Sequence, residues 1–315
     1  MKRTKFKTKS TNLNATNKTI AEGIEEFKRN CIARNLSSYT IRYYDNIIHT
    51  MQLCFDFDMQ IKDITETFWD EYIFFMQQRN CKDTTVASNA KGVRTILYFF
   101  MEKEYMINFQ IHLPKADEPL KKIYSEAEIE KLLKKPNIKD CCFSELRSWA
   151  MVVYFVGTGQ RLRTVLGLRI KDIDFENNLV TLTNVKNRKH TILPLSAKVV
   201  EVLQMYLEIR GGEPDDFLFC SWDGLELTKR GAEEAIWRYN SGRGVGKTSI
   251  HAFRHTFATN YLKAGGDVFR LQRLMCHSNI NVTKEYIHLT NADLAENMDN
   301  LTLLKNMSLR KIKMK

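Results

Sequence analysis

The sequence predicts a mainly α-helical protein with a small antiparallel β-sheet, an α+β fold class in two domains. Apolar residues recur at helical spacing along much of the 315-residue chain. One segment, 172–194, instead alternates apolar and polar residues between turn residues, which is typical of short strands. Residues 106–124 contain two prolines and no clear period, so they separate two groups of elements. A chain of this length can bury two hydrophobic cores.

We expect five parts along the chain: a basic tail over 1–18, a helical domain over 19–105, a linker over 106–124, a second domain over 125–304 and a basic tail over 305–315. The two tails carry six and five Lys or Arg residues and no acidic residue, which accounts for the whole net charge of +11. The rest of the chain is formally neutral. Net charge therefore supports nucleic-acid binding only weakly, through tails that can neutralise phosphates without reading sequence.

The first domain is predicted to be a bundle of four helices with short connections. Polar residues such as Thr19 and Ser37 precede the first two helices as caps. Residues 19–113 contain 10 basic and 13 acidic residues, which favours a bundle with solvated faces over a DNA-binding one. The four helices are expected over residues 19–35, 38–55, 65–79 and 83–103.

The second domain is predicted to open with a helix, because Ser125 and Glu128 have the spacing of a capping box. Gly157 and Gly159 end the apolar helix that follows, and Arg161 then lies at the N-terminus of another helix. Backbone N–H groups at such an N-terminus favour an anion. Outside the predicted sheet region, we expect helices over 146–157, 197–210 and 228–239 and a strand over 217–219.

Several other features of the sequence argue against particular classes of protein. Seven scattered cysteines, an odd number, indicate reduced thiols and no disulfide framework. No apolar run approaches eighteen residues, and the N-terminus lacks the apolar region of a secretory signal, so we expect a cytoplasmic protein. The glycine-rich segment 241–247 lacks the spacing of a phosphate-binding loop, and we predict a flexible connection there.

The sequence predicts no metal site and no cofactor. His251 and His255 have the spacing of half a zinc site, but no C-x-x-C pair completes it and no Glu follows His251. The chain also has no acidic cluster that could hold two divalent metal ions.

A candidate phosphate-binding site lies between residues 249 and 288. His251 and Arg254 are three residues apart, so on a helix they share a face. A guanidinium beside an imidazole suits a phosphate, because the guanidinium matches two oxygens at once. His277 and, nine residues later, Tyr286 follow, and a tyrosine there could attack the bound phosphate. Each of these residues alone is more often a packed or surface residue.

These residues occur in a larger ordered set. Thr158-Gly159-Gln160-Arg161, then Val165-Leu166-Gly167-Leu168, then Lys186, precede the His251 to Tyr286 block. With this set, residues 19–304 resemble the tyrosine recombinase (phage integrase) family of DNA strand-transfer enzymes. The resemblance implies a core-DNA-binding domain followed by a catalytic domain. It further implies that the second and fourth helices cross the DNA groove, with the candidate contact residues Thr40, Arg42, Lys91 and Arg94.

The resemblance and the residue chemistry together assign expected roles. Arg161 and Arg254 would clamp the non-bridging phosphate oxygens, with a hydrogen bond from His251. Tyr286 would attack, forming a 3′-phosphotyrosine, while His277 draws off its proton or holds the phosphate. Nearby cations would lower the pKa of Tyr286. The family places a catalytic lysine on the hairpin, and the spacing to Pro194-Leu195 selects Lys186 over Lys189, as donor to the departing 5′ oxygen.

Two departures from the family pattern are visible. Arg163 and Thr164 stand where the family's T-G-x-R-x-S-E box has a serine and an acid. Met275 and Cys276 stand where the family has Leu-Gly before the second histidine. We expect both departures to affect rate more than reaction type, and we interpret His288 as supporting structure, not as the base for Tyr286.

The expected function is site-specific recombination that integrates, excises or resolves a mobile element. We expect no folded arm-binding domain before Thr19, which favours the simpler recombinase architecture. The expected partners are duplex DNA with inverted core sites, in the nucleoid, and three further copies of the chain. Residues 292–307 have the pattern of an amphipathic helix. By default such a helix packs within its own domain. The resemblance instead implies that it docks on a neighbouring protomer of a tetramer on DNA. The alternatives are a non-cleaving DNA-binding regulator and a type IB-like topoisomerase.

Overall fold

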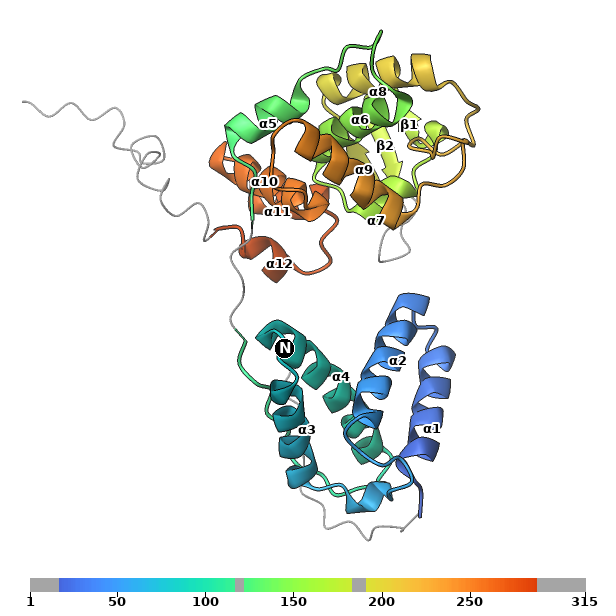
Figure 1. The fold of residues 1–315 in the computed structure, drawn as a ribbon, viewed down its shortest axis with the longest axis vertical. Helices are drawn as coiled ribbons and strands as arrows, with labels where there is room; N and C mark the ends of the chain where they lie inside the picture. The colour runs from blue at the N-terminus through green and yellow to red at the C-terminus, as the bar shows by residue number, and fades with distance from the viewer. Residues whose placement is uncertain (1–16, 117–121, 183–190, 288–315) are drawn as a thin grey trace, which may run out of the picture. The chain divides into compact units, whose positions relative to one another are not determined.

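The structure is a computed structural model that describes residues 17–116, 122–182 and 191–287. The chain divides into two compact units, Met1–Leu120 and Lys121–Lys315. Both units are mainly helical, and the only strands in the described residues form one three-stranded antiparallel sheet in the second unit (Figure 1). The predicted fold class is confirmed.

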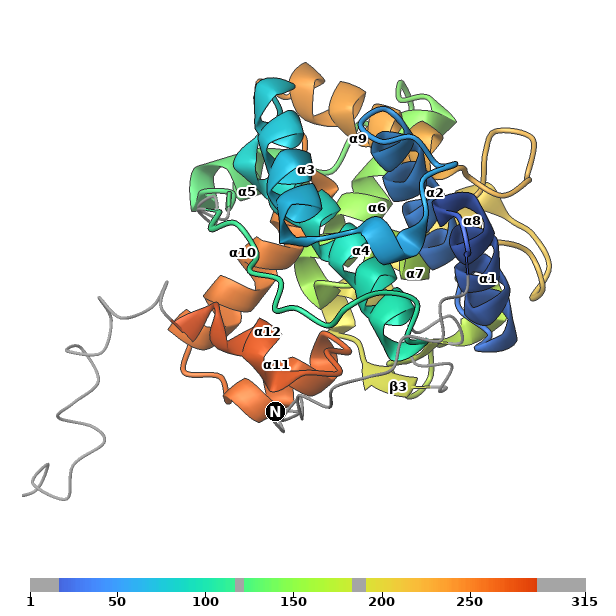
Figure 2. The ribbon, with the colours of Figure 1, turned by 90° about the horizontal axis from the view of Figure 1, so that it is seen from below.

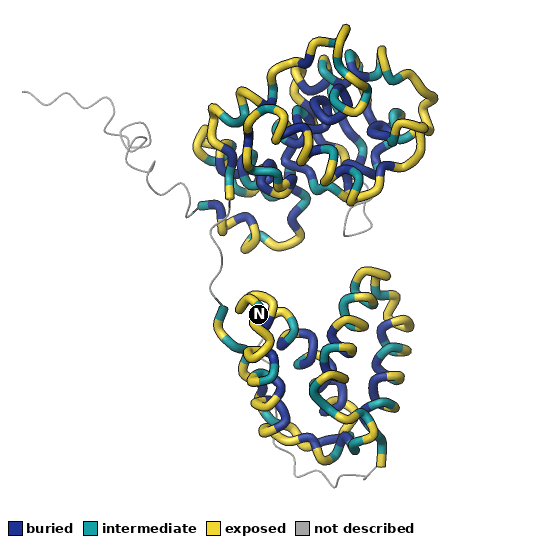
Figure 3. The backbone as a smooth tube through the Cα atoms, viewed as in Figure 1, coloured by how far each residue is buried: buried dark blue, intermediate teal, exposed yellow. Residues whose placement is uncertain are grey.

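Four α-helices and one short 3₁₀ helix form the described part of the first unit, and the predicted helix ends agree to within three residues. Thr19 caps the first helix in a capping box with Glu22, as its position before the apolar stripe predicts. The longest of the four supplies much of the core, and Figure 3 shows buried and exposed stretches alternating along the helices of this unit. The helices are α1 (Ile20–Ala33), α2 (Ser38–Gln52), η1 (Ile61–Asp63), α3 (Glu66–Gln78) and α4 (Asp83–Glu102).

The segment expected as a linker has buried residues near both of its ends. Met106 and Ile111 are buried in the core of the first unit, and Trp69 Nε1 donates a hydrogen bond to the carbonyl of His112 at 3.2 Å. Tyr124 is buried in the core of the second unit, where its ring stacks on Phe253 at 4.3 Å between centroids. Apolar side chains near each end of the segment are therefore buried in the core of the unit to which that end belongs. Their burial is favourable because exposing these side chains to water would cost free energy.

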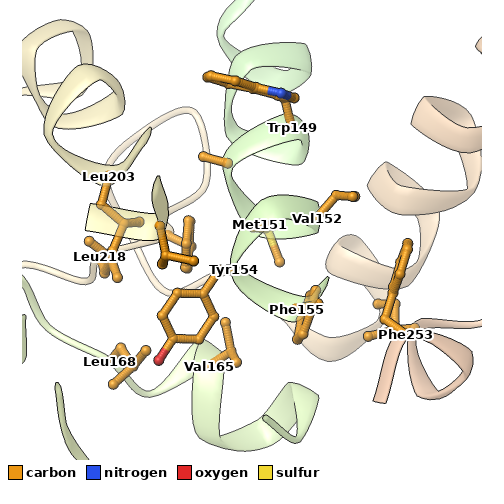
Figure 4. Packing of buried hydrophobic residues seen from close by; sticks show 14 of the residues in the cluster. Trp149, Met151, Val152, Tyr154, Phe155, Val165, Leu168, Leu203, Leu218 and Phe253 are labelled. Atoms are coloured by element: carbon orange, nitrogen blue, oxygen red, sulfur yellow. The ribbon is translucent and has the colours of Figure 1, made fainter. Parts of the chain in front are cut away.

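The second unit is built around α6 (Phe143–Thr158), which is apolar on most of its surface and is buried by neighbouring helices. Figure 4 shows its residues packed between the other elements, with Phe155 facing Phe253 and Tyr154 next to Leu168. Ser125 and Glu128 form the predicted capping box at the start of α5. The surrounding helices are α5 (Glu126–Leu133), α8 (Ala197–Arg210), α9 (Lys229–Gly242) and α10 (Ile250–Lys263).

The sheet consists of β1 (Ile173–Asp174), β2 (Leu179–Leu182) and β3 (Thr191–Pro194) in that order, each antiparallel to its neighbour. Val180 pairs with Leu193, so both side chains face the core. The hairpin between β2 and β3 contains Lys186, which lies outside the described residues. The predicted antiparallel sheet is confirmed.

Two local predictions in the second unit were wrong. Residues 217–219 form no strand: Phe217 makes one isolated bridge with Arg169, and Leu218 and Phe219 are buried without a neighbouring strand to extend the pairing. The segment 241–247 is held in place instead of being a free connection. Its Val245 is buried, and Asn240 Nδ2 donates hydrogen bonds to Lys247 O at 2.9 Å and to Tyr124 Oη at 3.1 Å.

Four short helices complete the described part of the unit: α7 (Leu162–Leu166), the 3₁₀ helix η2 (Ile170–Asp172) and, near the end of the described chain, α11 (Val268–Leu274) and α12 (Ile280–Lys284). α10, α11 and α12 are neighbours in both Figure 1 and Figure 2. All seven cysteines are free thiols. Within residues 17–116, 122–182 and 191–287, no helix is long and apolar enough to cross a membrane, and no group of three His, Cys, Asp or Glu residues could hold a metal ion.

Candidate active site

Arg254 lies at the centre of the candidate site. It projects from α10 and is only 2% exposed. Its Nη1 donates to the carbonyl of Gly159 at 2.6 Å, and its Nη2 donates to the carbonyl of Met275 at 2.7 Å and to Nε2 of His277 at 2.6 Å. One guanidinium thus joins the C-terminal end of α6 to the C-terminal end of α11.

Gly159 makes this contact possible. It ends α6 in the left-handed conformation, with φ of 60°, which turns its carbonyl toward Arg254. A Cβ at this position would overlap the ring of Phe257 on α10. The T-G-x-R pattern therefore has a structural reason at its glycine: positive φ and close packing both exclude a side chain.

Arg161 approaches the same carbonyls from the other side. It is half-buried at the N-cap of α7, and its Nη1 donates to Cys276 O at 3.2 Å and to Met275 O at 3.5 Å. The neighbouring Gln160 donates from Nε2 to Leu274 O at 2.7 Å. The last carbonyls of a helix lack partners within the helix, so α11 accepts hydrogen bonds here from two arginines and an amide.

The hydrogen bonds of His277 define its protonation. A guanidinium can only donate, so Nε2 of His277 must accept from Arg254 and carries no proton. Its Nδ1 lies 2.8 Å from Oγ1 of the buried Thr283 in α12, and in the neutral ring this nitrogen carries the proton and donates. His277 is therefore a neutral imidazole with both nitrogens engaged in hydrogen bonds.

The positive charge of Arg254 and Arg161 is not neutralised by the groups that accept their hydrogen bonds. Burial and, to a smaller extent, the charge of Arg161 lower the pKa of Arg254 to about 10. The guanidinium still remains protonated at neutral pH. Its hydrogen-bond acceptors are two carbonyls and an imidazole, with no carboxylate among them. A cation buried with neutral partners favours the entry of an anion.

Tyr286 is sequestered beside these cations. It is 2% exposed, and its ring packs with Ala258, Leu271 and Met275. Its hydroxyl lies 2.8 Å from Nδ1 of His255. Burial raises the pKa of Tyr286 and outweighs the opposing effect of Arg254 and Arg161. Arg254 and Arg161 do act in the expected direction and lower the pKa of this phenol, but the net shift in the free chain is upward, because desolvation of the phenolate is the larger effect.

The structure brings Arg161, Arg254, His277 and Tyr286 into one site and places His251 next to it. His251 is exposed at the start of α10, and its ring lies 4.7 Å from the ring of His255 between centroids. Lys186 and His288 lie outside the described residues.

Sequence reasoning missed His255, which it weighed only as half of a zinc site. His255 follows Arg254 directly and is four residues after His251, so the helical period already places it on the His251 face. The four-residue spacing was therefore the signal in the sequence that could have identified His255 as a site residue. Its partner Tyr286 is 31 residues further along the chain, and only the tertiary fold joins them.

The four predicted DNA-contact residues lie on two helices that pack against each other in the first unit. Gly92 allows close packing, since a Cβ there would lie 2.7 Å from Cγ1 of Ile47. Arg42 and Lys91 are exposed, whereas Arg94 is half-buried over the ring of Tyr98. Thr40 is half-buried with its Oγ1 2.9 Å from Oγ of Ser37. Their role in DNA binding stays a prediction.

Comparison with known proteins identifies the family. The family model described as the phage integrase family matches residues 122–293, which is more than half of the chain. The chain belongs to the phage integrase family. As a tyrosine recombinase it is a DNA strand transferase that acts on DNA in site-specific recombination.

Relatives within this family align over most of the chain. The chain is 28% identical over 272 residues to tyrosine recombinase XerC of Staphylococcus aureus (strain JH9), covering 84% of this chain and 90% of that one. It is 27% identical over 289 residues to tyrosine recombinase XerC of Roseiflexus sp. (strain RS-1), covering 87% and 91%.

Solved structures share the fold. The Tn1549 transposon integrase in complex with a circular intermediate DNA has a TM-score of 0.72 at 20% identity, covering 90% of this chain and 99% of that one. The XerH site-specific recombinase, bound to its palindromic difH substrate in a post-cleavage complex, has a TM-score of 0.68 at 22% identity, covering 87% and 83%.

Proposed function

We propose that this tyrosine recombinase cuts and rejoins duplex DNA through a covalent 3′-phosphotyrosine at Tyr286. The observation that carries the proposal is the pair of arginines: Arg161 and Arg254 both donate to the carbonyl of Met275, so two guanidiniums lie within one small volume. A scissile phosphodiester can replace that carbonyl as the shared acceptor of the two guanidiniums, and it brings the negative charge that their present acceptors lack.

In this proposal the fixed cations supply the electrostatic part of catalysis. The non-bridging oxygens gain charge as the phosphorus becomes five-coordinate, and Arg161 and Arg254 stabilise that charge with donors that are already oriented. His251 at the rim adds a hydrogen bond to the same phosphate. Loss of one such donor typically costs about 3 to 4 kcal/mol of barrier, or roughly 10²- to 10³-fold in rate.

The reaction conserves the phosphodiester bond energy. Tyr286 Oη forms a bond to phosphorus, the bond from phosphorus to the 5′ oxygen breaks, and Lys186 donates a proton to that oxygen. The 5′ hydroxyl of a partner strand can then attack the phosphotyrosine, return the phenol and reseal the DNA without an external energy source. His277 holds Arg254 in place for both steps, as its hydrogen bond with the guanidinium supports.

The proposed setting is strand exchange between inverted core sites during integration, excision or resolution of a mobile element. Four protomers would assemble on the DNA, with residues 292–307 of each docking on a neighbour. The relationship to tyrosine recombinase XerC over most of both chains supports exchange between defined sites.

A trapping assay tests the chemistry. Purified protein is mixed with nicked suicide duplexes cut from the DNA that flanks its own coding sequence, and denaturing gels report covalent adducts. The wild type should form adducts, and Tyr286→Phe should bind the same duplexes without forming them. Adducts formed by Tyr286→Phe would refute the nucleophile.

The same assay separates the alternatives. Wild-type protein that binds the duplexes and never forms an adduct would be a non-cleaving regulator. Relaxation of supercoiled plasmid without site preference would indicate a topoisomerase. Sequenced junctions between two sites would establish recombination and identify the core sequence.

A further inference from the structure

We propose that His255 is the group that accepts the proton of Tyr286 during strand cleavage. This inference rests on the proposed role of Tyr286 as nucleophile. Nδ1 of His255 lies 2.8 Å from Oη of Tyr286, and the two ring centroids are 5.6 Å apart. A general base must lie within hydrogen-bond reach of the proton it removes, and His255 already does so in the free protein.

His277, the base suggested by sequence, is less suited to this task. Its Nε2 accepts a hydrogen bond from Arg254, and its Nδ1 lies 2.8 Å from Oγ1 of Thr283. Its basic lone pair is therefore engaged by a cation that cannot give up its own proton without cost. This arrangement makes His277 an anchor for Arg254 and leaves the contact with the phenol to His255.

The hydrogen bond between Tyr286 and His255 has a defined direction. Burial raises the pKa of Tyr286, so the phenol keeps its proton in the free protein and can donate it to Nδ1. The neutral imidazole then carries its own proton on Nε2. Transfer of the phenol proton along this hydrogen bond produces a phenolate and an imidazolium in one short step.

The surrounding charges link this transfer to DNA binding. An imidazolium at His255 would lie near Arg254 and Arg161 and next to His251 on the same helix. Among the described residues, Glu285 is the one acidic group that influences the pKa of Tyr286. In the empty site, positive charges oppose proton transfer to the imidazole. A bound phosphodiester, whose negative charge grows in the transition state, offsets them. Burial thus keeps the phenol protonated in the empty site, and a bound phosphate favours the imidazolium that receives the proton.

The step balances in both directions. In cleavage, the O–H bond of Tyr286 breaks and His255 Nδ1 takes the proton. The phenolate oxygen bonds to phosphorus, and the 5′ oxygen leaves with a proton from Lys186. In rejoining, Lys186 takes the proton of the attacking 5′ hydroxyl, and the His255 imidazolium returns its proton to the departing phenolate. No oxidant, metal or other reactant is needed.

Two substitutions separate proton transfer from positioning. In His255→Asn, the side-chain oxygen can take the place of Nδ1 and accept the phenol hydrogen bond, but it cannot hold the proton. His255→Leu removes both functions. We expect both variants to bind the suicide duplex like wild type and to form the adduct about 10²- to 10⁴-fold more slowly. Near wild-type cleavage by His255→Asn, with slow cleavage by His255→Leu, would reduce His255 to positioning and overturn the proposal.

A modified substrate identifies which proton is affected. A duplex with sulfur at the 5′ bridging position has a leaving group that needs no protonation. This duplex should restore cleavage by Lys186→Ala and should leave His255→Asn slow. Restoration of His255→Asn would place His255 at the leaving group instead of the nucleophile and would refute the assignment.

Controls keep the result interpretable. Asn260→Ala, an exposed position on the same helix, should cleave and bind like wild type. Thermal unfolding reports whether each variant is folded. If His255→Asn is unfolded, cleavage by His255→Ala is measured with and without added imidazole. Restored cleavage with imidazole would support His255 as the proton acceptor, and no restoration would oppose that role. Adducts formed by Tyr286→Phe would remove the proposed nucleophile itself, an outcome distinct from a normal rate in His255→Asn.

Discussion

Arg254 and His277, 23 residues apart in sequence, share a buried hydrogen bond of 2.6 Å in which the guanidinium donates to Nε2 of the imidazole. The bond fixes the proton of His277 on Nδ1 and holds Arg254 between two helix ends. Donor and acceptor are thereby oriented before DNA arrives. Preorganised donors of this kind need no rearrangement as charge develops on a phosphate.

Replacement of Arg254 by lysine should abolish most cleavage while retaining positive charge. A lysine presents one ammonium group and cannot bond Gly159 O, Met275 O and His277 together. We expect covalent-adduct formation on a suicide duplex to fall by roughly 10²- to 10³-fold, with a weaker effect on binding.

The matched control is Arg147→Lys. Arg147 is also a buried arginine whose Nη1 donates to a carbonyl, that of Cys220, at 2.7 Å, but it has no part in the proposed reaction. Its replacement should lower thermal stability without a comparable loss of cleavage at saturating DNA. An equal loss of cleavage in both variants would mean that buried arginines matter here for stability alone.

Replacement of Gly159 by alanine should destabilise the protein and distort the site. The added Cβ would meet the ring of Phe257, and the positive φ is itself unfavourable for alanine. We expect a loss of about 1 to 3 kcal/mol in the free energy of unfolding, measured by urea denaturation.

Gly265→Ala is the control for Gly159→Ala. Gly265 also has a positive φ, of 79°, but a Cβ there would meet nothing within 4 Å. The free energy of unfolding of this variant should fall only by the amount due to backbone strain, and cleavage should be preserved. If the free energy of unfolding falls equally in the two variants, packing against Phe257 contributes nothing to the cost of Gly159→Ala.

The features predictable from the sequence are those that local patterns encode. Apolar spacing and polar caps located the helices, as with Thr19 before α1 and Ser125 before α5, because helix formation depends on residues within one or two turns. The order of Arg161, Arg254, His277 and Tyr286 likewise indicated a single phosphate site.

The features that sequence reasoning missed depend on distant partners. Residues 217–219 have the composition of a strand but no neighbouring strand. The glycine-rich segment 241–247 is held partly by a hydrogen bond from Asn240 to Tyr124, 116 residues away. The pKa of Tyr286 depends on how deeply its ring is packed, which composition does not reveal.

Replacement of Thr283 by valine should weaken the site without changing its shape. Valine matches threonine in volume but removes Oγ1, which leaves the N–H of His277 buried without that acceptor. We expect a loss of about 1 to 3 kcal/mol in the free energy of unfolding. Cleavage should also slow, because His277 loses the acceptor of its Nδ1 proton and with it one of the two hydrogen bonds that orient the ring toward Arg254. Thr283→Ser, which keeps the hydroxyl, should restore both properties, and a valine variant with normal stability and rate would contradict the assigned hydrogen bond.

The buried phenol of Tyr286 predicts a specific alkaline behaviour. Its pKa is raised by burial above the ordinary value near 10, so the folded protein holds this proton at pH values where the unfolded chain has lost it. The resulting stability is fully present below pH 10 and is lost as pH rises through the folded pKa. Tyr286→Phe has no such proton. We therefore expect the stability of the wild type relative to Tyr286→Phe to fall with rising pH above 10 and to stay constant below it, measured by denaturation at each pH.

A spectroscopic titration tests the same pKa independently. The difference in phenolate absorbance between wild type and Tyr286→Phe should show ionisation only above pH 10 in the free protein. Ionisation of this phenol near neutral pH without DNA would mean that Arg161 and Arg254 outweigh burial, the reverse of the order found in the structure. Titration above pH 10 would instead mean that the nucleophile is kept protonated by the same packing that hides it, so that its proton must be removed by a base in direct contact with the hydroxyl, the position that His255 occupies.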